Sequence, residues 1–176
     1  FNAVIQATPL SCMLYNNPIA YGVELSPRDV RELCETNANV HALKDSSGDV
    51  RLLTALREAL GDRLALFAGL DNMVVECALM GANGWIAGLV NAFPSESVRL
   101  YELARDGKAV EARKLYEWFL PMLRMDTVPK FVQLIKLVQQ EVGQGSERVR
   151  APRLVLTGAE RDEAIRIVMV ARDKRP

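Results

Sequence analysis

The chain has 176 residues, 22 basic and 22 acidic, and its formal net charge at neutral pH is zero. Balanced charge without a long one-signed run argues against polyanion binding and against a nucleic-acid or membrane surface. The interrupted apolar runs fall short of the roughly 20 residues that a membrane-spanning helix needs. Three scattered cysteines, Cys12, Cys34 and Cys77, form no C-x-x-C pair, which is typical of buried thiols in a reducing compartment. We therefore expect a cytoplasmic globular protein.

Short apolar segments in the first half of the chain alternate with segments of helical spacing. After a helical tail at 1–7, strands are expected at 11–15, 40–44, 64–68 and 84–89. Helix starts follow each strand: Ser26-Pro27 is a capping serine with proline at the first helical position, and Asp49 and Ser95 are expected caps. A further helix is expected between Gly69 and Met80. The unit of strand, loop and helix thus occurs four times.

The second half of the chain shows helical patterns alone. An amphipathic helix is expected over 108–120, with Pro121 as a kink or an end, and another over 129–142. A connection follows, and Thr157 to Glu160 reads as a capping box that opens the last helix. We expect residues 108–176 to form a helical extension on residues 1–107.

Four successive βα units predict parallel strands with right-handed crossovers, as in an open α/β sheet or in part of a barrel. No Gly-x-Gly-x-x-Gly sequence follows the first expected strand, which weakens the dinucleotide-binding form of the open sheet. A closed barrel needs eight units. The pattern therefore leaves an open sheet or half of a barrel.

The residues capable of chemistry collect at the carboxyl ends of these strands, where both architectures bind ligands. Tyr15 ends the first strand, Lys44 the second, and Gly69 and Asp71 follow the third. A strand-ending lysine is ordinarily solvated, and a strand-ending tyrosine is often a packing residue. Held among apolar neighbours, however, a lysine amine is favoured in its neutral form and can attack a ketone. The protonated Schiff base permits carbon–carbon cleavage, dehydration or deamination without a metal or cofactor, with Tyr15 as a candidate proton carrier.

Other candidates have simpler explanations. His41 is the only histidine and lies at the opposite end of its strand, so a site built from several histidines is excluded and a structural role is expected. Ser46 and Ser47 have no nearby base, which argues against a serine nucleophile. Trp85 and Trp118 are expected to be core aromatic residues. No metal site is predicted.

The runs Leu14 to Pro18 and Leu43 to Asp49 resemble the second half of the dihydrodipicolinate synthase and N-acetylneuraminate lyase family, and the strand ends at 67–71 and 81–88 continue the resemblance in register. That family consists of class I, Schiff-base-forming aldolases of the pyruvate type. Its fold is an eight-stranded (β/α) barrel with a C-terminal helical extension, usually assembled as a homotetramer. The resemblance implies an α/β fold: about four βα units, the second half of a TIM (β/α)8 barrel, followed by the extension.

The family resemblance implies roles for individual residues of this chain. By this resemblance Lys44 is the Schiff-base lysine and Tyr15 the tyrosine of the proton relay. The backbone at Gly69 and Ile86 would line the keto-acid pocket, and Asp71 stands where sugar-acid lyases bind a substrate hydroxyl. The expected substrate-binding residues are thus Gly69, Asp71, Ile86, Ala87 and Gly88.

Two departures limit the resemblance. Ala20 stands where dihydrodipicolinate synthases carry an arginine that binds the substrate carboxylate, which makes lysine biosynthesis doubtful. The family's first four strands, with a Gly-Thr-Thr-Gly-Glu loop that holds the keto-acid carboxylate, have no counterpart in the sequence. We therefore expect the chain, which starts at Phe1, to be part of a longer one. Half a barrel would expose two strand edges and an apolar face.

The resulting expectation is a Schiff-base lyase acting on a small 2-keto acid or related imino acid. Ala20 and the bulky Trp85 favour a catabolic dehydratase, deaminase or aldolase, working as a homo-oligomer, a dimer or tetramer, without nucleic acid or membrane partners. Two alternatives remain open. One is a noncatalytic relative that senses a keto acid, and the other is an inactive fragment that needs the missing half-barrel.

Overall fold

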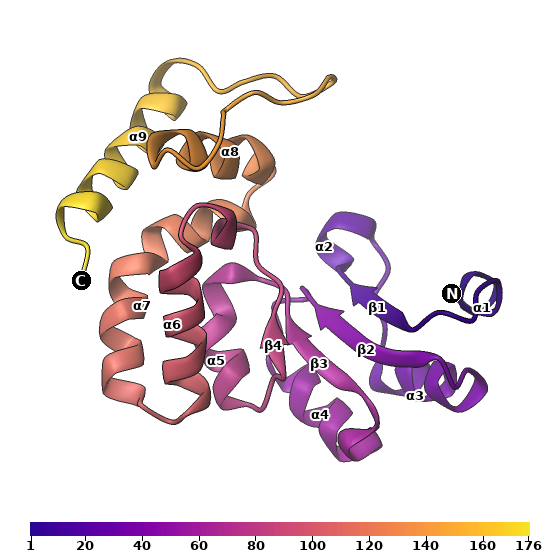
Figure 1. Ribbon diagram of the computed structural model, residues 1–176. Coiled ribbons are helices and arrows are strands. Elements are labelled where there is room, and N and C mark those ends of the chain that lie inside the picture. The colour runs from indigo at the N-terminus through magenta and orange to yellow at the C-terminus, as the bar shows by residue number, and fades with distance from the viewer. The chain divides into compact units, whose positions relative to one another are not determined.

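The chain folds into two compact units. The computed structural model describes all residues 1–176, and the units comprise residues 1–86 and residues 87–176 (Figure 1). The first unit contains a parallel sheet with helices, and the second is helical apart from its loops. The expected division at residue 107 falls inside the second unit, between two of its helices, and the extent of the helical extension remains a prediction.

The sheet of the first unit has four parallel strands, β1 (Cys12–Asn16), β2 (Val40–Asp45), β3 (Ala65–Ala68) and β4 (Gly84–Trp85), in the order β1-β2-β3-β4. Spatial order therefore equals sequence order, and each crossover returns to the neighbouring strand. A doubly wound sheet reverses direction part of the way across, which these four strands do not do. The arrangement is that of successive strands in a barrel wall.

The helices of the first unit are α1 (Asn2–Gln6), α2 (Pro18–Tyr21), α3 (Pro27–Thr36), α4 (Arg51–Leu60) and α5 (Val74–Leu79), with short 3-10 turns at Gly61–Arg63 and Asp71–Met73. At the start of α3 the predicted Ser26 cap is confirmed, because Ser26 Oγ accepts from Asp29 N–H. The predicted Asp49 cap is displaced by one residue: Val50 is the N-cap of α4, and Asp49 Oδ1 accepts from Arg51 N–H.

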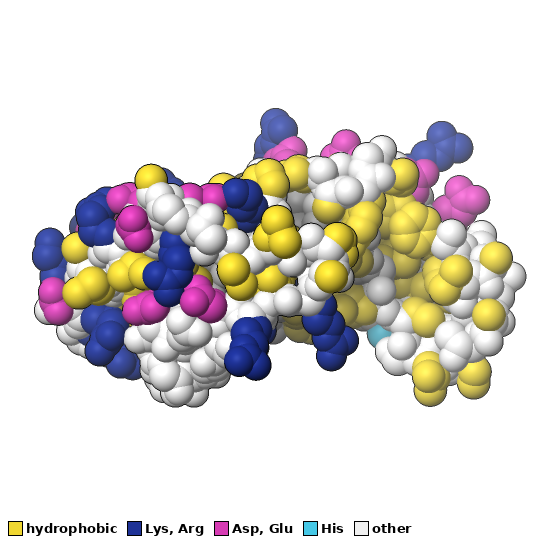
Figure 2. Space-filling model, turned by 90° about the horizontal axis from the view of Figure 1, so that it is seen from above, with side chains coloured by type: hydrophobic (Ala, Val, Ile, Leu, Met, Phe, Trp, Pro, Cys, Tyr) yellow, Lys and Arg dark blue, Asp and Glu magenta, His cyan; other side chains and the backbone are white.

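The core of the first unit lies on one face of the sheet. Strand side chains alternate between the two faces, and Leu14, Leu43 and Leu66 are at most 3% exposed on the face that packs against helical residues such as Val30 and Leu53. On the other face Met13 is 47% exposed and Tyr15 is 36% exposed. Figure 2 shows that hydrophobic side chains remain visible at the molecular surface among charged ones. An open apolar face follows from four strands that do not close on themselves.

The fourth strand is shorter than predicted. Strand pairing covers only Gly84 and Trp85, although Ile86 N still donates to Ala68 O at 3.0 Å. Gly88 adopts a helical backbone conformation and begins a 3-10 turn over Leu89–Asn91. A Cβ on Gly88 would approach Asp126 Oδ1 within 2.4 Å. The apolar run continues to Val90, but close packing within the second unit ends its extended conformation.

The second unit contains α6 (Pro94–Arg105), α7 (Ala109–Leu123), α8 (Phe131–Glu141) and α9 (Gly158–Asp173), with a 3-10 turn at Arg124–Thr127. Its aromatic core is built by Phe93, Trp118 and Phe119, whose ring centroids lie 5.1 to 6.0 Å apart. Trp118 Nε1 also donates to Ala171 O at 2.8 Å, so α7 and α9 are joined by a polar contact inside an apolar interface.

Three predicted helix ends of the second unit differ in detail. Ser95 lies inside α6, because Pro94 takes the first helical position and Phe93 the N-cap. Of the two roles predicted for Pro121, the helix end is wrong, because α7 contains Pro121 and continues to Leu123, and the kink remains a prediction. Thr157 occupies the N-cap position of α9 but makes no capping hydrogen bond with its side chain. Its predicted partner Glu160 instead pairs with a lysine, so the predicted capping box is absent.

Candidate active site

Four residues form one rung across the sheet near its carboxyl end. Tyr15 pairs with Lys44, Lys44 with Phe67, and Phe67 with Gly84. Partners on neighbouring parallel strands stand about 5 Å apart and project to the same face. That face is the one opposite the helix-packed core, so the rung is presented on the open side of the sheet. The predicted strand positions of Tyr15 and Lys44 thus bring the two side chains together.

The amine of Lys44 lies over the ring of Tyr15. Lys44 Nζ is 4.6 Å from the ring centroid, and Lys44 itself is half-buried. The Tyr15 ring also meets Tyr21 edge to face, with centroids 5.9 Å apart, and its hydroxyl accepts a hydrogen bond from Asn17 Nδ2 at 2.9 Å. These contacts hold the phenol in one orientation beside the amine, and its O–H remains able to donate.

A buried polar network anchors the ends of β1 and β2 behind this pair. Asn16 Nδ2 donates to Asp45 Oδ1 at 2.8 Å, while Asn16 Oδ1 accepts from Leu25 N–H at 3.0 Å. Ser47 Oγ donates to Asp45 Oδ2 at 2.8 Å. Burial raises the pKa of Asp45, and the hydrogen bonds from Asn16 and Ser47 oppose that rise. This network was not predicted from the sequence, although Asn16 and Asp45 fall at the inward positions of their strands.

The backbone of Gly69 passes against the residues that follow Lys44. A Cβ at Gly69 would lie 2.2 Å from Ser46 Oγ and 2.5 Å from Asp45 O, distances that real Cβ atoms do not show. Ser46 is 1% exposed and its Oγ has no hydrogen-bond partner. Glycine is therefore required at position 69 because the two strand ends approach each other closely there. This requirement does not depend on the backbone torsion angles of the residue.

The other predicted pocket residues divide between the two units. Asp71 is fully buried and its Oδ1 accepts from Trp85 Nε1 at 3.1 Å, so contact between Asp71 and a substrate hydroxyl remains a prediction. Ile86 closes the first unit through its bond to Ala68 O. Ala87 and Gly88 begin the second unit, and Gly88 packs there against Asp126. The structure thus brings together Tyr15, Lys44 and the Gly69 backbone in one unit.

The remaining chemical candidates lie elsewhere. His41 Nδ1 is 2.7 Å from Ser11 Oγ at the amino-terminal end of the sheet, where it joins β2 to the residue before β1. No three His, Cys, Asp or Glu side chains lie close enough to hold a metal ion. No helix is both long and apolar enough to cross a membrane. The chemistry to be explained is therefore that of the lysine–tyrosine pair.

Several known proteins are similar to this chain in sequence. A 4-hydroxy-tetrahydrodipicolinate synthase of Thermomicrobium roseum is 30% identical over 163 residues, covering 93% of this chain and 54% of the relative. A synthase of the same name from Clostridium perfringens is 33% identical over 69% of this chain and 42% of the relative. A probable 5-dehydro-4-deoxyglucarate dehydratase of Acidovorax ebreus is 30% identical over 90% of this chain and 53% of the relative. The chain spans about half the length of these proteins.

Solved structures show the same fold. The 4-hydroxy-tetrahydrodipicolinate synthase of Methylacidiphilum fumariolicum superposes with a TM-score of 0.89 at 26% identity, over 99% of this chain and 58% of that one. YagE, a prophage protein of the dihydrodipicolinic acid synthase family from E. coli in complex with pyruvate, gives 0.87 at 25% identity, over 98% and 59%. The predicted α/β fold, a half-barrel of four βα units followed by helices, is confirmed.

Sequence comparison extends over almost the whole chain. Residues 1–171 match the Dihydrodipicolinate synthetase family. The relatives named above include both synthases and a dehydratase, so the family resemblance recognised in the Tyr15 and Lys44 motifs is confirmed without naming one substrate. The chain belongs to the dihydrodipicolinate synthetase family.

Proposed function

We propose that this chain supplies the Schiff-base half of a class I lyase that acts on a small 2-keto acid or a related imino acid. The observation that carries the proposal is the position of Lys44 Nζ, 4.6 Å from the Tyr15 ring centroid on the open face of the sheet. An amine beside a phenol, at the carboxyl end of parallel strands, is suited to carbonyl chemistry. The names of the synthase and dehydratase relatives support the same reaction class.

The proposed reaction begins with attack by the neutral Lys44 amine on the keto carbon. The carbinolamine loses its oxygen as water and becomes a protonated imine. Because the imine nitrogen is positively charged, it accepts the electron pair left on the adjacent carbon when a C–C bond or a C–H bond there breaks, which gives an enamine. After loss of that proton, the enamine can return the electron pair and expel a hydroxyl group from the next carbon, which is the dehydration. The Tyr15 hydroxyl supplies and removes the protons that these steps require. Water then hydrolyses the imine and frees Lys44.

The substrate assignment within this class rests on the pocket residues. Ala20 is exposed at the end of a one-turn helix and offers no cation to a second carboxylate, so we propose a catabolic dehydratase, deaminase or aldolase rather than a synthase of lysine biosynthesis. In the first unit the pocket would be lined by the backbone of Gly69 and Ile86. Ala87 and Gly88, the next residues of the chain, and Asp71, which must leave its buried position to reach a substrate hydroxyl, stay predicted substrate-binding residues. Comparing turnover of pyruvate plus an aldehyde with dehydration of a 2-keto-3-deoxy sugar acid separates the aldolase from the dehydratase.

The direct test is borohydride reduction of the full-length protein in the presence of pyruvate, followed by peptide mass spectrometry. The expected result is a reduced pyruvyl adduct on Lys44 alone. Lys44→Arg should abolish the adduct while retaining the fold, and Lys114→Arg, which changes an exposed lysine of α7, should leave it unchanged. An adduct of equal yield in Lys44→Arg would refute the mechanism.

The open face of the sheet also supports a proposal about how the active protein assembles. Met13 and Tyr15 on this face are 47% and 36% exposed, and β1 and β4 are the two outer strands of the sheet. We propose that four further βα units of a longer chain cover this face, and that the complete barrels assemble as a homo-oligomer in the cytoplasm. Analytical ultracentrifugation of the 176-residue chain is expected to show self-association. A stable, active monomer would contradict this.

A further inference from the structure

A hollow of about 450 Å³ in the second unit lies between α8 and the extended segment that connects α8 to α9. It is lined by four cationic side chains and two valines, namely Lys136, Arg148, Arg150, Arg153, Val132 and Val149. The three arginines are exposed and Lys136 is half-buried. We call this hollow, with the four cations that line it, the arginine groove. Its volume falls within the range of small-molecule sites.

None of the four cations has a carboxylate partner, although neighbouring cations do. Arg161 pairs with Glu147, Lys130 with Glu160, and Arg166 with Glu163. Residues 148–153 contain three arginines and no acid, and Glu147, the nearest acid in sequence, is already held by Arg161 at 3.0 and 3.2 Å. The chain's overall charge balance therefore conceals a local excess of positive charge.

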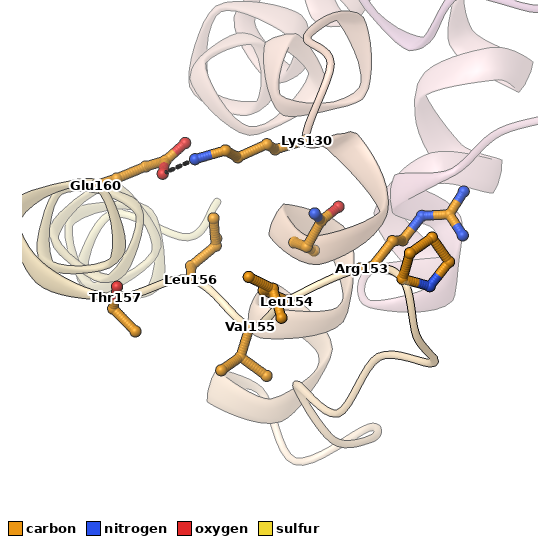
Figure 3. Close-up of a pocket in the computed structure, with 9 residues that line it drawn as sticks. Lys130, Arg153, Leu154, Val155, Leu156, Thr157 and Glu160 are labelled. Carbon is orange, nitrogen blue, oxygen red and sulfur yellow. Dashed lines mark hydrogen bonds and ion pairs between the residues drawn. The ribbon is translucent and has the colours of Figure 1, made fainter.

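The segment that carries the arginines is anchored at both ends. Glu147 fixes its start through Arg161 and through a bond from its backbone N–H to Gln140 Oε1, and Leu156, 5% exposed, fixes its end in the core of the unit. A turn closed by Arg153 N–H and Arg150 O shapes the middle. In Figure 3 the Arg153 guanidinium points away from the Lys130–Glu160 pair. The backbone that carries the three arginines is thus fixed beside α8, and their exposed side chains remain accessible to a ligand.

We propose that the arginine groove binds a small molecule that carries clustered oxyanions, such as two linked phosphate groups. Guanidinium groups bind phosphate and carboxylate oxygens in bidentate fashion, and the Lys136 ammonium adds a point charge to the lining. No aromatic side chain lines the hollow to stack on bases, and its lining belongs to one compact unit, which favours a small ligand over a nucleic acid. This site is separate from the lysine–tyrosine pair and does not depend on its proposed activity.

The test is calorimetric titration of the full-length protein with pyrophosphate, citrate, inorganic phosphate and a single-stranded RNA oligomer. Pyrophosphate should bind saturably, inorganic phosphate more weakly, and the affinity for pyrophosphate should fall as salt rises from about 50 mM to about 200 mM. Citrate binding as tight as that of pyrophosphate would show recognition of carboxylates within the same oxyanion class. RNA that binds more tightly than pyrophosphate would overturn the proposal.

Variants separate the groove from general surface charge. The double variant Arg148→Gln/Arg150→Gln should weaken pyrophosphate binding at least about tenfold, since hydrogen bonds to charged groups are lost. Lys136→Gln should weaken it several-fold. The charge-matched control Arg99→Gln/Lys114→Gln, on exposed positions of α6 and α7, should change affinity less than about twofold because the groove is intact. Equal weakening by the control, or no saturable binding by the unaltered protein, would refute the site.

Discussion

Gly69→Ala tests whether the close approach of two strand ends supports the candidate site. The added Cβ would lie 2.5 Å from Asp45 O and 2.2 Å from Ser46 Oγ. Ordinary van der Waals contact requires about 3.4 Å or more, so the backbone of β2 and the residue after β3 must separate by about 1 Å. Overpacking of this kind costs about 1 to 3 kcal/mol of unfolding free energy.

The strand end that must move is the one that carries Lys44. Asp45 O belongs to the peptide unit directly after the Lys44–Asp45 bond, and a displacement of about 1 Å near a reacting group can lower a rate about 100-fold. We therefore expect Gly69→Ala to lower both the urea midpoint of unfolding and the rate of borohydride trapping of pyruvate at Lys44. Circular dichroism reports the first quantity and mass spectrometry the second.

Two comparisons identify the contact responsible. Ser46→Ala alone should be close to neutral for stability, because the Ser46 hydroxyl is buried without a partner. In the double variant Ser46→Ala/Gly69→Ala, stability should recover only in part, since the clash with the Asp45 carbonyl remains. Full recovery, or a Gly69→Ala protein as stable and as quickly trapped as the unaltered one, would refute the reasoning.

Three further predictions follow from buried groups of the first unit. Asn16→Ala should lower the unfolding free energy by about 2 to 4 kcal/mol, measured in urea, because it leaves the buried Leu25 N–H without an acceptor and removes one of the two donors to Asp45 Oδ1. Burial raises the pKa of Asp45 above 3.8 in the folded protein. The protein should therefore lose stability relative to the Asp45→Asn variant as the pH rises from about 3.8 through the folded-state pKa, and above that pKa the difference in unfolding free energy should stay constant. A difference in unfolding free energy that is independent of pH would contradict this. Burial raises the pKa of the Cys77 thiol to about 12. Ellman's reagent at pH near 8 should therefore label half-buried Cys12 first and Cys77 only after unfolding. Equal labelling rates of the two cysteines would contradict this.

Several features of the molecule were readable from local sequence because they depend on neighbours along the chain. The positions of β1, β2 and β3 follow from short apolar runs, and the start of α3 follows from the reciprocal bonds between Ser26 and Asp29. Tyr15 and Lys44 could be placed at strand ends for the same reason. Helix caps were less readable at Ser95 and Thr157, where a proline and an ion pair of Glu160 determine the local structure.

Tertiary structure decided what depends on residues far apart in sequence. The shared rung of Tyr15 and Lys44 requires the register between β1 and β2, and the need for Gly69 arises from Asp45 O and Ser46 Oγ on another strand. Full burial of Asp71 depends on packing that no local pattern encodes, and so does the convergence of Arg148, Arg150 and Arg153 on Lys136. The sequence determined which chemical groups are present and which strand ends carry them, since strand periodicity is local. Folding alone determined which of those groups meet, because proximity depends on register and packing.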